Sequence, residues 1–181
     1  MRIEILEDVL DGEPSYSHPK SAAVLIPIIN SSSPQLLMIQ RALNLKRNAG
    51  ELAFPGGFQE GNETPKETAL REFKEELGID GQEVKVIGYL QPQELAKYKI
   101  FVYPVVGLLG SIEKKLVPGY EVRKIIIGNF ANIFSTRTFS KDNTIFEFCG
   151  HAVEGVTSKI LDDLYFRLRG HYQNKRDLKI V

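Results

Sequence analysis

The chain has one cysteine, no tryptophan and no excess of charge of either sign. Of its 181 residues, 23 are Lys or Arg and 23 are Asp or Glu, so the formal net charge is zero. A balanced charge provides no overall attraction to nucleic acid or to an acidic membrane surface, and we expect neither as a partner. An anionic ligand must therefore be held by a local group of residues.

The single cysteine, Cys149, excludes an internal disulfide framework and a cysteine-rich zinc site, and it fits a reducing compartment. It lies in the apolar run IFEFCG, so we expect a buried side chain on a strand. The three histidines, His18, His151 and His171, share no metal-ligand spacing.

Long apolar runs are also missing. The N-terminal sequence MRIEILEDVL carries early acids and no long apolar core, which argues against a signal peptide. The longest apolar run is too short to span a bilayer, so no membrane association is expected. We expect a cytoplasmic protein with a single domain over residues 1–181, which is long enough to bury a sizeable core.

Strands and helices alternate along the chain without internal repeats. Runs rich in branched apolar residues predict strands near 22–29, 36–40, 85–90, 99–109 and 145–150. Apolar residues at helical spacing predict a packing helix over 157–168. The polar, basic tail GHYQNKRDLKIV is expected to be a loose end or a contact with a partner subunit.

The clearest helix lies in the middle of the chain. Thr64, Pro65 and Glu67 provide an N-cap, a proline at the first helical position and the acid of a capping box. Gly78 is placed to end the helix in a left-handed conformation. The expected buried stripe consists of Ala69, Leu70, Phe73 and Leu77.

The same helix carries the acidic sequence REFKEELG. Glu72, Glu75 and Glu76 cluster on a face separate from the apolar stripe, and like charges one turn apart repel each other. A bound divalent cation would offset that repulsion, whereas a solvated surface would merely tolerate it. The preceding FPGG, with Gly56 and Gly57, allows close backbone approach to a ligand, although a tight turn alone would also explain the two glycines.

Taken together, these residues resemble a known motif. Gly57, five residues, Glu63, seven residues and then REFKEELGI resemble the Nudix box, with every fixed position filled. The resemblance implies an α/β (α+β) fold, an α/β/α sandwich around a mixed sheet. It also implies hydrolysis of a nucleoside diphosphate linked to another moiety, with Mg²⁺ or Mn²⁺ as the cofactor.

The resemblance further implies roles for the box residues. Glu72, Glu75 and Glu76 would be the metal carboxylates, together with a backbone carbonyl of Gly56 or Gly57. These are the hard oxygen ligands that Mg²⁺ takes, and the cation neutralises diphosphate oxygens and lowers the pKa of water.

Two further box positions, Arg71 and Glu63, are expected to support the metal ligands. Arg71 would orient Glu63 or Glu72 through charge-assisted hydrogen bonds. The general base stays open at this point: Glu72 and Glu121 are the main candidates, and Glu94 and Glu113 are not excluded.

Substrate choice depends on residues outside the box. The segment LMIQRALNLKRNAGELAFPGG resembles the one before the box in coenzyme A pyrophosphatases, which release 3′,5′-ADP and 4′-phosphopantetheine. Arg41, Lys46 and Arg47 are the expected contacts to substrate phosphates. Lys46 departs from the arginine usual there, so it keeps the charge and loses the planar fork.

Two other functions stay open. One is a Nudix pyrophosphatase for ADP-ribose or another nucleotide. The other is a non-catalytic nucleotide-binding module, whose usual mark is a lost box glutamate, and none is lost here. Related enzymes are often homodimers, so the resemblance implies a homodimer as one arrangement, and the oligomeric state stays open.

Overall fold

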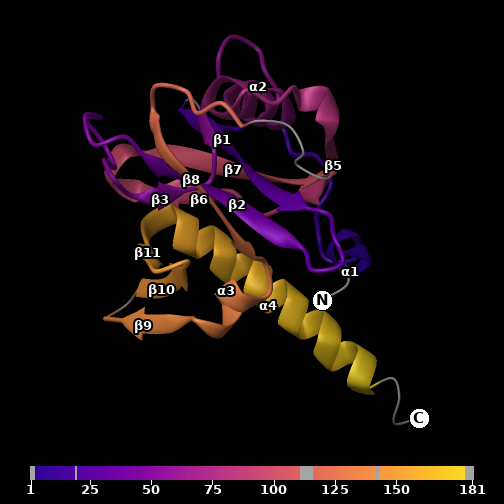
Figure 1. The fold of residues 1–181 in the computed structure, drawn as a ribbon. Helices are drawn as coiled ribbons and strands as arrows, with labels where there is room; N and C mark the ends of the chain where they lie inside the picture. The colour runs from indigo at the N-terminus through magenta and orange to yellow at the C-terminus, as the bar shows by residue number, and fades with distance from the viewer. Residues whose placement is uncertain (1–2, 19, 111–115, 142, 178–181) are drawn as a thin grey trace.

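A mixed β-sheet lies between two helices, α2 (Pro65–Leu77) on one face and α4 (Gly155–Asp177) on the other (Figure 1). The computed structural model describes residues 3–18, 20–110, 116–141 and 143–177. The remaining helical elements are α1 (Glu4–Glu7), α3 (Asn132–Ser135) and the 3₁₀ turns η1 (Gly81–Glu83) and η2 (Ala96–Tyr98). The strands are β1 (Ser21–Ile29), β2 (Gln35–Arg41), β3 (Leu52–Ala53), β4 (Gly56–Phe58), β5 (Val84–Tyr89), β6 (Gln93–Leu95), β7 (Ile100–Leu109), β8 (Val122–Asn129), β9 (Thr138–Ser140), β10 (Asn143–Phe148) and β11 (His151–Val153).

The main sheet is built around one parallel pair, β1 and β7. Its order is β3-β2-β1-β7-β5, and β4, β6 and β8 pair with β1, β7 and β2. All pairs other than β1 with β7 are antiparallel, so the sheet is mixed as predicted. β9, β10 and β11 form a separate three-stranded sheet below it (Figure 1).

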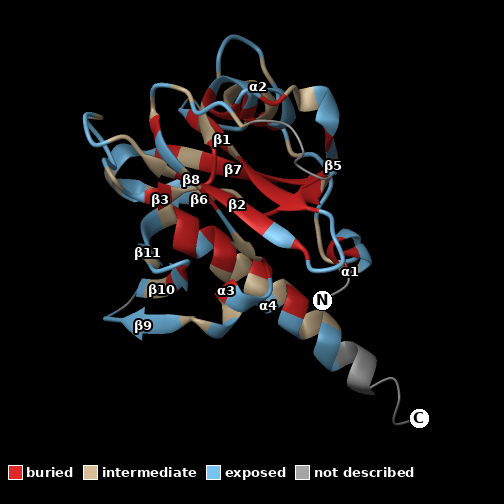
Figure 2. Ribbon diagram, in the orientation of Figure 1, coloured by how far each residue is buried: buried red, intermediate tan, exposed pale blue. Residues whose placement is uncertain are grey.

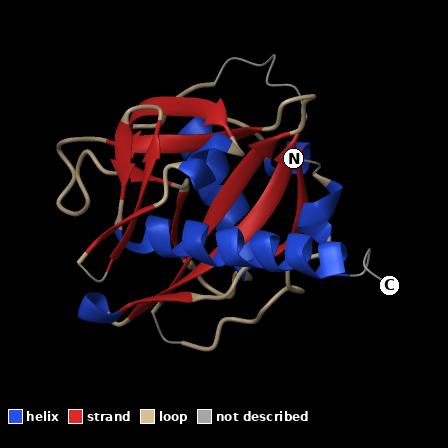
Figure 3. Cartoon of the chain, turned by 90° about the horizontal axis from the view of Figure 1, so that it is seen from below, coloured by secondary structure: helices blue, strands red, loops and turns tan. Residues whose placement is uncertain are grey.

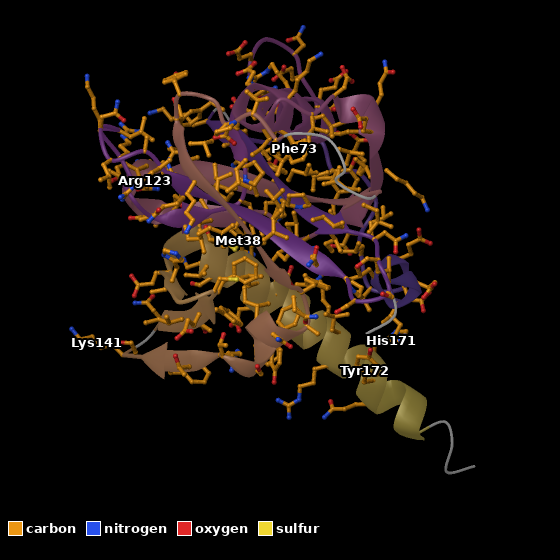
Figure 4. The ribbon with its side chains drawn as sticks, in the orientation of Figure 1. Met38, Phe73, Arg123, Lys141, His171 and Tyr172 are labelled. Atoms are coloured by element: carbon orange, nitrogen blue, oxygen red, sulfur yellow. The ribbon has the colours of Figure 1, made fainter. Side chains whose placement is uncertain are left out.

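Each central strand contributes to two cores, because successive side chains point to opposite faces of a sheet. In β1, Ala23, Leu25 and Ile29 pack toward α2, while Ala22, Ile26 and Ile28 pack toward α4. Phe73 of α2 and Met38 of β2 mark the two sides (Figure 4). The strands between the two helices are buried on both faces (Figure 2), which confirms the expected α/β/α sandwich.

Local signals determine the bounds of α2. The Thr64 side chain accepts from the backbone N–H of Glu67, and the Glu67 side chain accepts from the backbone N–H of Thr64. Gly78 adopts a left-handed conformation with φ of 72° and donates to the carbonyl of Lys74. Both ends of the helix thus lie where the sequence predicted them. Of the expected stripe, Ala69, Phe73 and Leu77 are fully buried, whereas Leu70 is only partly buried.

The last helix is longer than predicted. The sequence indicated a helix over 157–168 and then a tail that is either a loose end or a contact with a partner subunit, but α4 continues to Asp177 and crosses under the sheet (Figure 3). Residues 178–181 of that tail lie outside the described residues, and the contact with a partner stays a prediction. Ile160, Leu161, Leu164 and Leu168 bury one side of it. After Leu168 no residue up to Gln173 is buried, and Arg169, Tyr172 and Gln173 are exposed (Figure 2).

Cys149 is exposed, which corrects the prediction of a buried residue. The strand of the IFEFCG run ends at Phe148, and Cys149 begins the turn between β10 and β11 with a positive φ of 51°. The turn takes its side chain out of the alternation that buries Phe146 and Phe148.

All five predicted strands are present, whereas the sequence interpretation missed β8 and the short strands β3, β4, β6, β9 and β11. Among the described helices, none combines the length and apolar character that a membrane crossing requires. The single domain and the homodimer stay predictions.

Candidate active site

The acidic face of α2 lies against the short strand β4, and two glycines allow this close approach. A Cβ atom at Gly57 would overlap the carboxylate of Glu72, and one at Gly56 would overlap the backbone of Ala23 and Val24 in β1. Glycine is therefore required by space at position 56, and at position 57 a larger residue would displace the Glu72 side chain. The FPGG sequence serves helix-to-sheet packing and brings backbone next to the helix acids.

Glu76 is the most buried acid of the site, with 5% of its surface exposed. One carboxylate oxygen, Oε2, accepts a hydrogen bond from the backbone N–H of Gly56 at 3.0 Å. Burial raises the pKa of Glu76 to about 8, and this hydrogen bond opposes the shift only in part. The acid is thus poorly solvated in its ionised form, and a nearby cation would stabilise that form.

Arg71 joins four parts of the site through its guanidinium. Nε donates to Glu63 at 2.7 Å, and Nη1 donates to Glu72 at 2.9 Å and to Glu75 at 3.3 Å. Nη2 donates to the carbonyl of Phe58 at 2.9 Å. These bonds raise the pKa of Arg71, Glu63 contributing most, so the guanidinium stays charged. Arg71 contacts both acids that it was expected to orient.

Glu63 links the loop before α2 to the helix. Besides Arg71, its carboxylate accepts from the hydroxyl of Thr68 at 2.9 Å and from the backbone N–H of Glu60 at 3.0 Å. The hydrogen bond from Arg71 is the main cause that lowers the pKa of Glu63. A carboxylate with all these donors is held in one orientation, as a positioning residue must be.

Glu72 and Glu75 differ in environment although both contact Arg71. The Glu72 side chain is 18% exposed, and burial is the main cause that raises its pKa, although Arg71 acts in the opposite direction. The Glu75 side chain is 59% exposed and faces solvent. The solvent exposure of the three helix acids therefore decreases from Glu75 through Glu72 to the buried Glu76.

The described side chains, as they stand, contain no group of three or more His, Cys, Asp or Glu arranged to hold a metal ion. Instead, the guanidinium of Arg71 bridges Glu72 and Glu75. Its positive charge lies between two carboxylates, as the charge of a metal cation would. The donor set is made of carboxylate and backbone oxygens, and the space above Gly57 is filled by the Glu72 carboxylate. Carboxylate and backbone oxygens of this kind are the ligands that Mg²⁺ or Mn²⁺ would take.

Glu121 lies next to the acids of α2. Its charge is among the causes that raise the pKa values of Glu72 and Glu76. Oε2 of Glu121 accepts from Nη2 of Arg41 at 3.2 Å, and Oε1 accepts from the hydroxyl of Tyr120 at 2.9 Å. The structure thus brings Glu121 and Arg41 to the same site.

Of the other two candidates for the general base, Glu94 is not brought together with the acids of α2. Glu94 is an exposed residue of β6, opposite Phe101 of β7. Within the described residues, no hydrogen bond or ion pair joins Glu94 to the α2 acids. Glu113 lies outside the described residues.

The expected phosphate contacts separate in space. Arg41 is at the end of β2 with its guanidinium on Glu121, whereas Lys46 and Arg47 are exposed in the following loop. The guanidinium of Arg47 lies 5.1 Å from the centre of the Tyr98 ring. A phosphate role for these three residues stays a prediction.

The sequence interpretation did not identify three residues that support the site. Thr68 supports Glu63, Tyr120 contacts Glu121, and Gly119 packs against the end of α2. The sequence PGYEVRK carried a signal for the last two, because a glycine and an aromatic residue directly precede the acid. Thr68 had no signal beyond its place on the helix.

Comparison with known proteins agrees with this geometry. A NUDIX domain model matches residues 19–121, which include Arg41, the whole box and Glu121. The chain belongs to the NUDIX domain family. It is similar to the uncharacterized Nudix hydrolase NudL of Escherichia fergusonii, with 40% identity over 110 residues that cover 60% of this chain and 55% of that protein. The chain thus spans about half the length of the curated relatives it matches.

Solved structures support the fold. A MutT/nudix family protein from Enterococcus faecalis superposes with a TM-score of 0.54 at 18% identity, covering 82% of this chain and 61% of that chain. The NUDIX domain of Shewanella oneidensis NrtR, solved with ADP ribose, gives a TM-score of 0.53 at 12% identity, covering 87% and 90%. At these identities the likeness shows the fold alone, and it confirms the Nudix fold that the box implied.

Proposed function

We propose that this protein is a metal-dependent hydrolase that cleaves the diphosphate of a nucleoside diphosphate linked to another moiety. The observation that carries the proposal is the buried acid Glu76 beside Gly56, in a helix whose other two box acids are bridged by Arg71. This arrangement concentrates oxygen ligands at one place, where a divalent cation would offset the repulsion among the ionised carboxylates.

Each residue has a distinct part in the proposed chemistry. Glu72, Glu75 and Glu76 would hold the divalent ion together with a carbonyl of Gly56 or Gly57, and the ion would neutralise diphosphate oxygens and make water more acidic. Arg71 and Glu63 hold the Glu72 carboxylate in place through the bonds described above.

The water-activating base is assigned to Glu121 in this proposal. Its carboxylate lies near those of Glu72 and Glu76, and two hydrogen bonds fix its orientation. Glu72 is the alternative base, because it also belongs to the acidic cluster. Its hydrogen bond from Arg71 and its expected role as a metal ligand leave it less available to accept a proton.

Coenzyme A or a derivative is the proposed substrate. The support is the segment before the box, where Arg41, Ala42, Lys46, Gly50 and the FPGG sequence have the spacing of coenzyme A pyrophosphatases. Lys46 and Arg47 are exposed in the loop that follows Arg41, and they carry positive charge in a chain that has none in excess. Cleavage would release 3′,5′-ADP and 4′-phosphopantetheine.

A second candidate substrate is ADP-ribose or another nucleotide. Lys46 stands where coenzyme A pyrophosphatases usually have arginine, which weakens the assignment to that subfamily. The NrtR domain that shares this fold was solved with ADP ribose. A nucleoside diphosphate is common to both candidates, so the same acids and metal ion would serve either.

The test is a substrate panel read by mass spectrometry of the products in Mg²⁺ or Mn²⁺. The panel contains coenzyme A, dephospho-coenzyme A, ADP-ribose, NADH, diadenosine polyphosphates and nucleoside triphosphates. Glu76→Gln protein purified in parallel excludes a contaminating enzyme. Conversion of coenzyme A to 3′,5′-ADP and phosphopantetheine supports the first candidate, and preference for ADP-ribose supports the second. Binding of these compounds without turnover of any would contradict hydrolysis and favour a non-catalytic binding module.

A further inference from the structure

The loop before β8 is attached by its backbone to the end of α2. The N–H of Val117 donates to the carbonyl of Leu77 at 3.1 Å, and the N–H of Gly119 donates to the carbonyl of Glu76 at 2.8 Å. The last four carbonyls of an α-helix lack hydrogen-bond donors within the helix, and this loop provides donors for two of these carbonyls. A Cβ atom at Gly119 would come within 2.6 Å of the Glu75 carbonyl oxygen, so only glycine allows this contact.

Glu121, two residues further on, is held by the end of β2. The backbone N–H of Ala42 donates to its carbonyl at 2.8 Å, and Nη2 of Arg41 reaches its carboxylate at 3.2 Å. Pairing of β2 with β8 shifts at this point: Gln40 lies opposite Lys124, and Arg41 lies opposite Val122. Such an irregularity re-aims a side chain at the end of a ladder, here that of Arg41.

Arg41 is already surrounded by protein groups. Its side chain is 21% exposed, and its Nε is buried and has no hydrogen-bond partner among the described residues. Its charge also acts on Glu76, whose pKa it lowers. Because the Arg41 guanidinium is paired with Glu121 and largely buried, little of it is accessible to a substrate phosphate.

We propose that Arg41 is a positioning residue that holds Glu121 against the acidic face of α2 and acts on the reaction through Glu121. This inference rests on the proposed function, and it replaces the direct phosphate contact predicted for Arg41. The Arg41–Glu121 ion pair and the attachment of residues 117 and 119 to α2 hold Glu121 from two sides. The carboxylate thereby stays near Glu72 and Glu76 despite the repulsion among the three acids.

The kinetic test compares Arg41→Gln, Arg41→Lys, Glu121→Gln and the Arg41→Gln/Glu121→Gln double variant on whichever panel substrate the wild type cleaves. Arg41→Gln is expected to lower kcat by roughly tenfold or more while KM changes by less than about threefold. Arg41→Lys restores part of the loss, because an ammonium group still pairs with Glu121. The kcat of the double variant is expected to equal that of Glu121→Gln within about twofold. Once the Glu121 carboxylate is gone, loss of the arginine that positions it should have no further effect.

The matched control is Lys124→Gln, which removes the same charge from the neighbouring pair of the same ladder. It is expected to leave kcat and KM within about twofold of wild type. A rise in KM for Arg41→Gln with unchanged kcat, or losses that multiply in the double variant, would overturn the positioning role and restore a substrate contact.

A second readout does not depend on turnover. Hydrogen exchange at the Ala42 amide, which donates to Glu121, is expected to accelerate at least tenfold in Arg41→Gln and to stay unchanged in Lys124→Gln. If the wild type cleaves nothing in the panel, the proposed function fails, and this exchange measurement still decides whether Arg41 fixes Glu121. Unchanged exchange at Ala42 in Arg41→Gln would contradict the inference in either case.

Discussion

The carboxylate of Glu76, although nearly inaccessible to solvent, is hydrogen-bonded to the backbone N–H of Gly56 at 3.0 Å, across the junction of α2 and β4. Helix and sheet therefore meet at an ionisable group whose pKa burial raises to about 8. A group of this kind weakens the fold at neutral pH unless a cation is bound, and the first prediction follows from this relationship.

Glu76→Gln is expected to stabilise the metal-free protein at neutral pH. The native state keeps the Glu76 proton up to about pH 8, while the unfolded chain releases it near its ordinary pKa of 4.5. The native state therefore binds more protons between these values, and stability falls as pH rises through this window. In EDTA at pH 7 the variant should gain on the order of 1–3 kcal/mol in the free energy of unfolding, and little at pH 4.5. Urea unfolding at both pH values measures this, and an equal difference at both would contradict it.

Glu75→Gln is expected to separate function from stability. The Glu75 side chain is 59% exposed, and among the described residues its hydrogen bond comes from Arg71, so its loss should change the free energy of unfolding by no more than about 0.5 kcal/mol. Loss of a metal carboxylate should lower turnover by orders of magnitude. Chemical unfolding and turnover of the panel substrate are the two measurements. Wild-type turnover at saturating Mg²⁺ would contradict the metal assignment.

Arg71→Lys is expected to weaken both the fold and the site, because a lysine cannot make the forked bonds to Glu63 and Glu72. We expect a loss of about 1–2 kcal/mol in stability at pH 7, after allowance for partial exposure of the pair. Turnover should fall roughly 10- to 100-fold, as for other residues that orient metal ligands.

The pH dependence of Arg71→Lys provides its control. Arg71 lowers the pKa of Glu63 below 4.5, so the stabilisation is complete above that pH and is lost as pH falls through the lowered pKa. The stability difference between wild type and variant should therefore shrink in acid. A difference that persists or grows below pH 4.5 would mean that Arg71 acts through something other than the Glu63 carboxylate.

Gly57→Ala is expected to displace Glu72, because the added Cβ would overlap its carboxylate. A displacement of about 1 Å at a catalytic group lowers turnover roughly 100-fold, and we expect a loss of that size. Gly12→Ala is the matched control, since no atom lies within 4 Å of a Cβ there. Wild-type turnover in Gly57→Ala would mean that the Glu72 position is not important for the reaction.

Features with local signals were predictable from the sequence. The capping box at Thr64 and the glycine at Gly78 determine the ends of α2 through contacts within a few residues. The Nudix box likewise singled out the three helix acids, Arg71 and Glu63, whose roles in metal binding and catalysis stay predictions. The sequence did not indicate that Glu76 would be buried and Glu75 exposed, because β4 covers one side of α2 only after the sheet has formed.

Long-range features could not be predicted in this way. The ion pair between Arg41 and Glu121 joins residues 80 positions apart, and it depends on a shift in the pairing of β2 with β8. β8 itself was missed because only one side chain in its first half, Val122, is buried, and charged residues follow it. The turn at Cys149 was missed because its positive φ occurs at a residue other than glycine.

The alternation of β1 and β7 between two cores has a consequence for biosynthesis. Every residue assigned to the site has been synthesised once residue 121 is added, whereas Ile26, Ile28, Val106 and Leu108 stay uncovered until α4 has been made and packs on them. A nascent chain therefore contains every residue of the acidic site before the helix that covers the opposite face of the same sheet exists. Chains that end before residue 155 should contain the whole Nudix box and yet aggregate during translation.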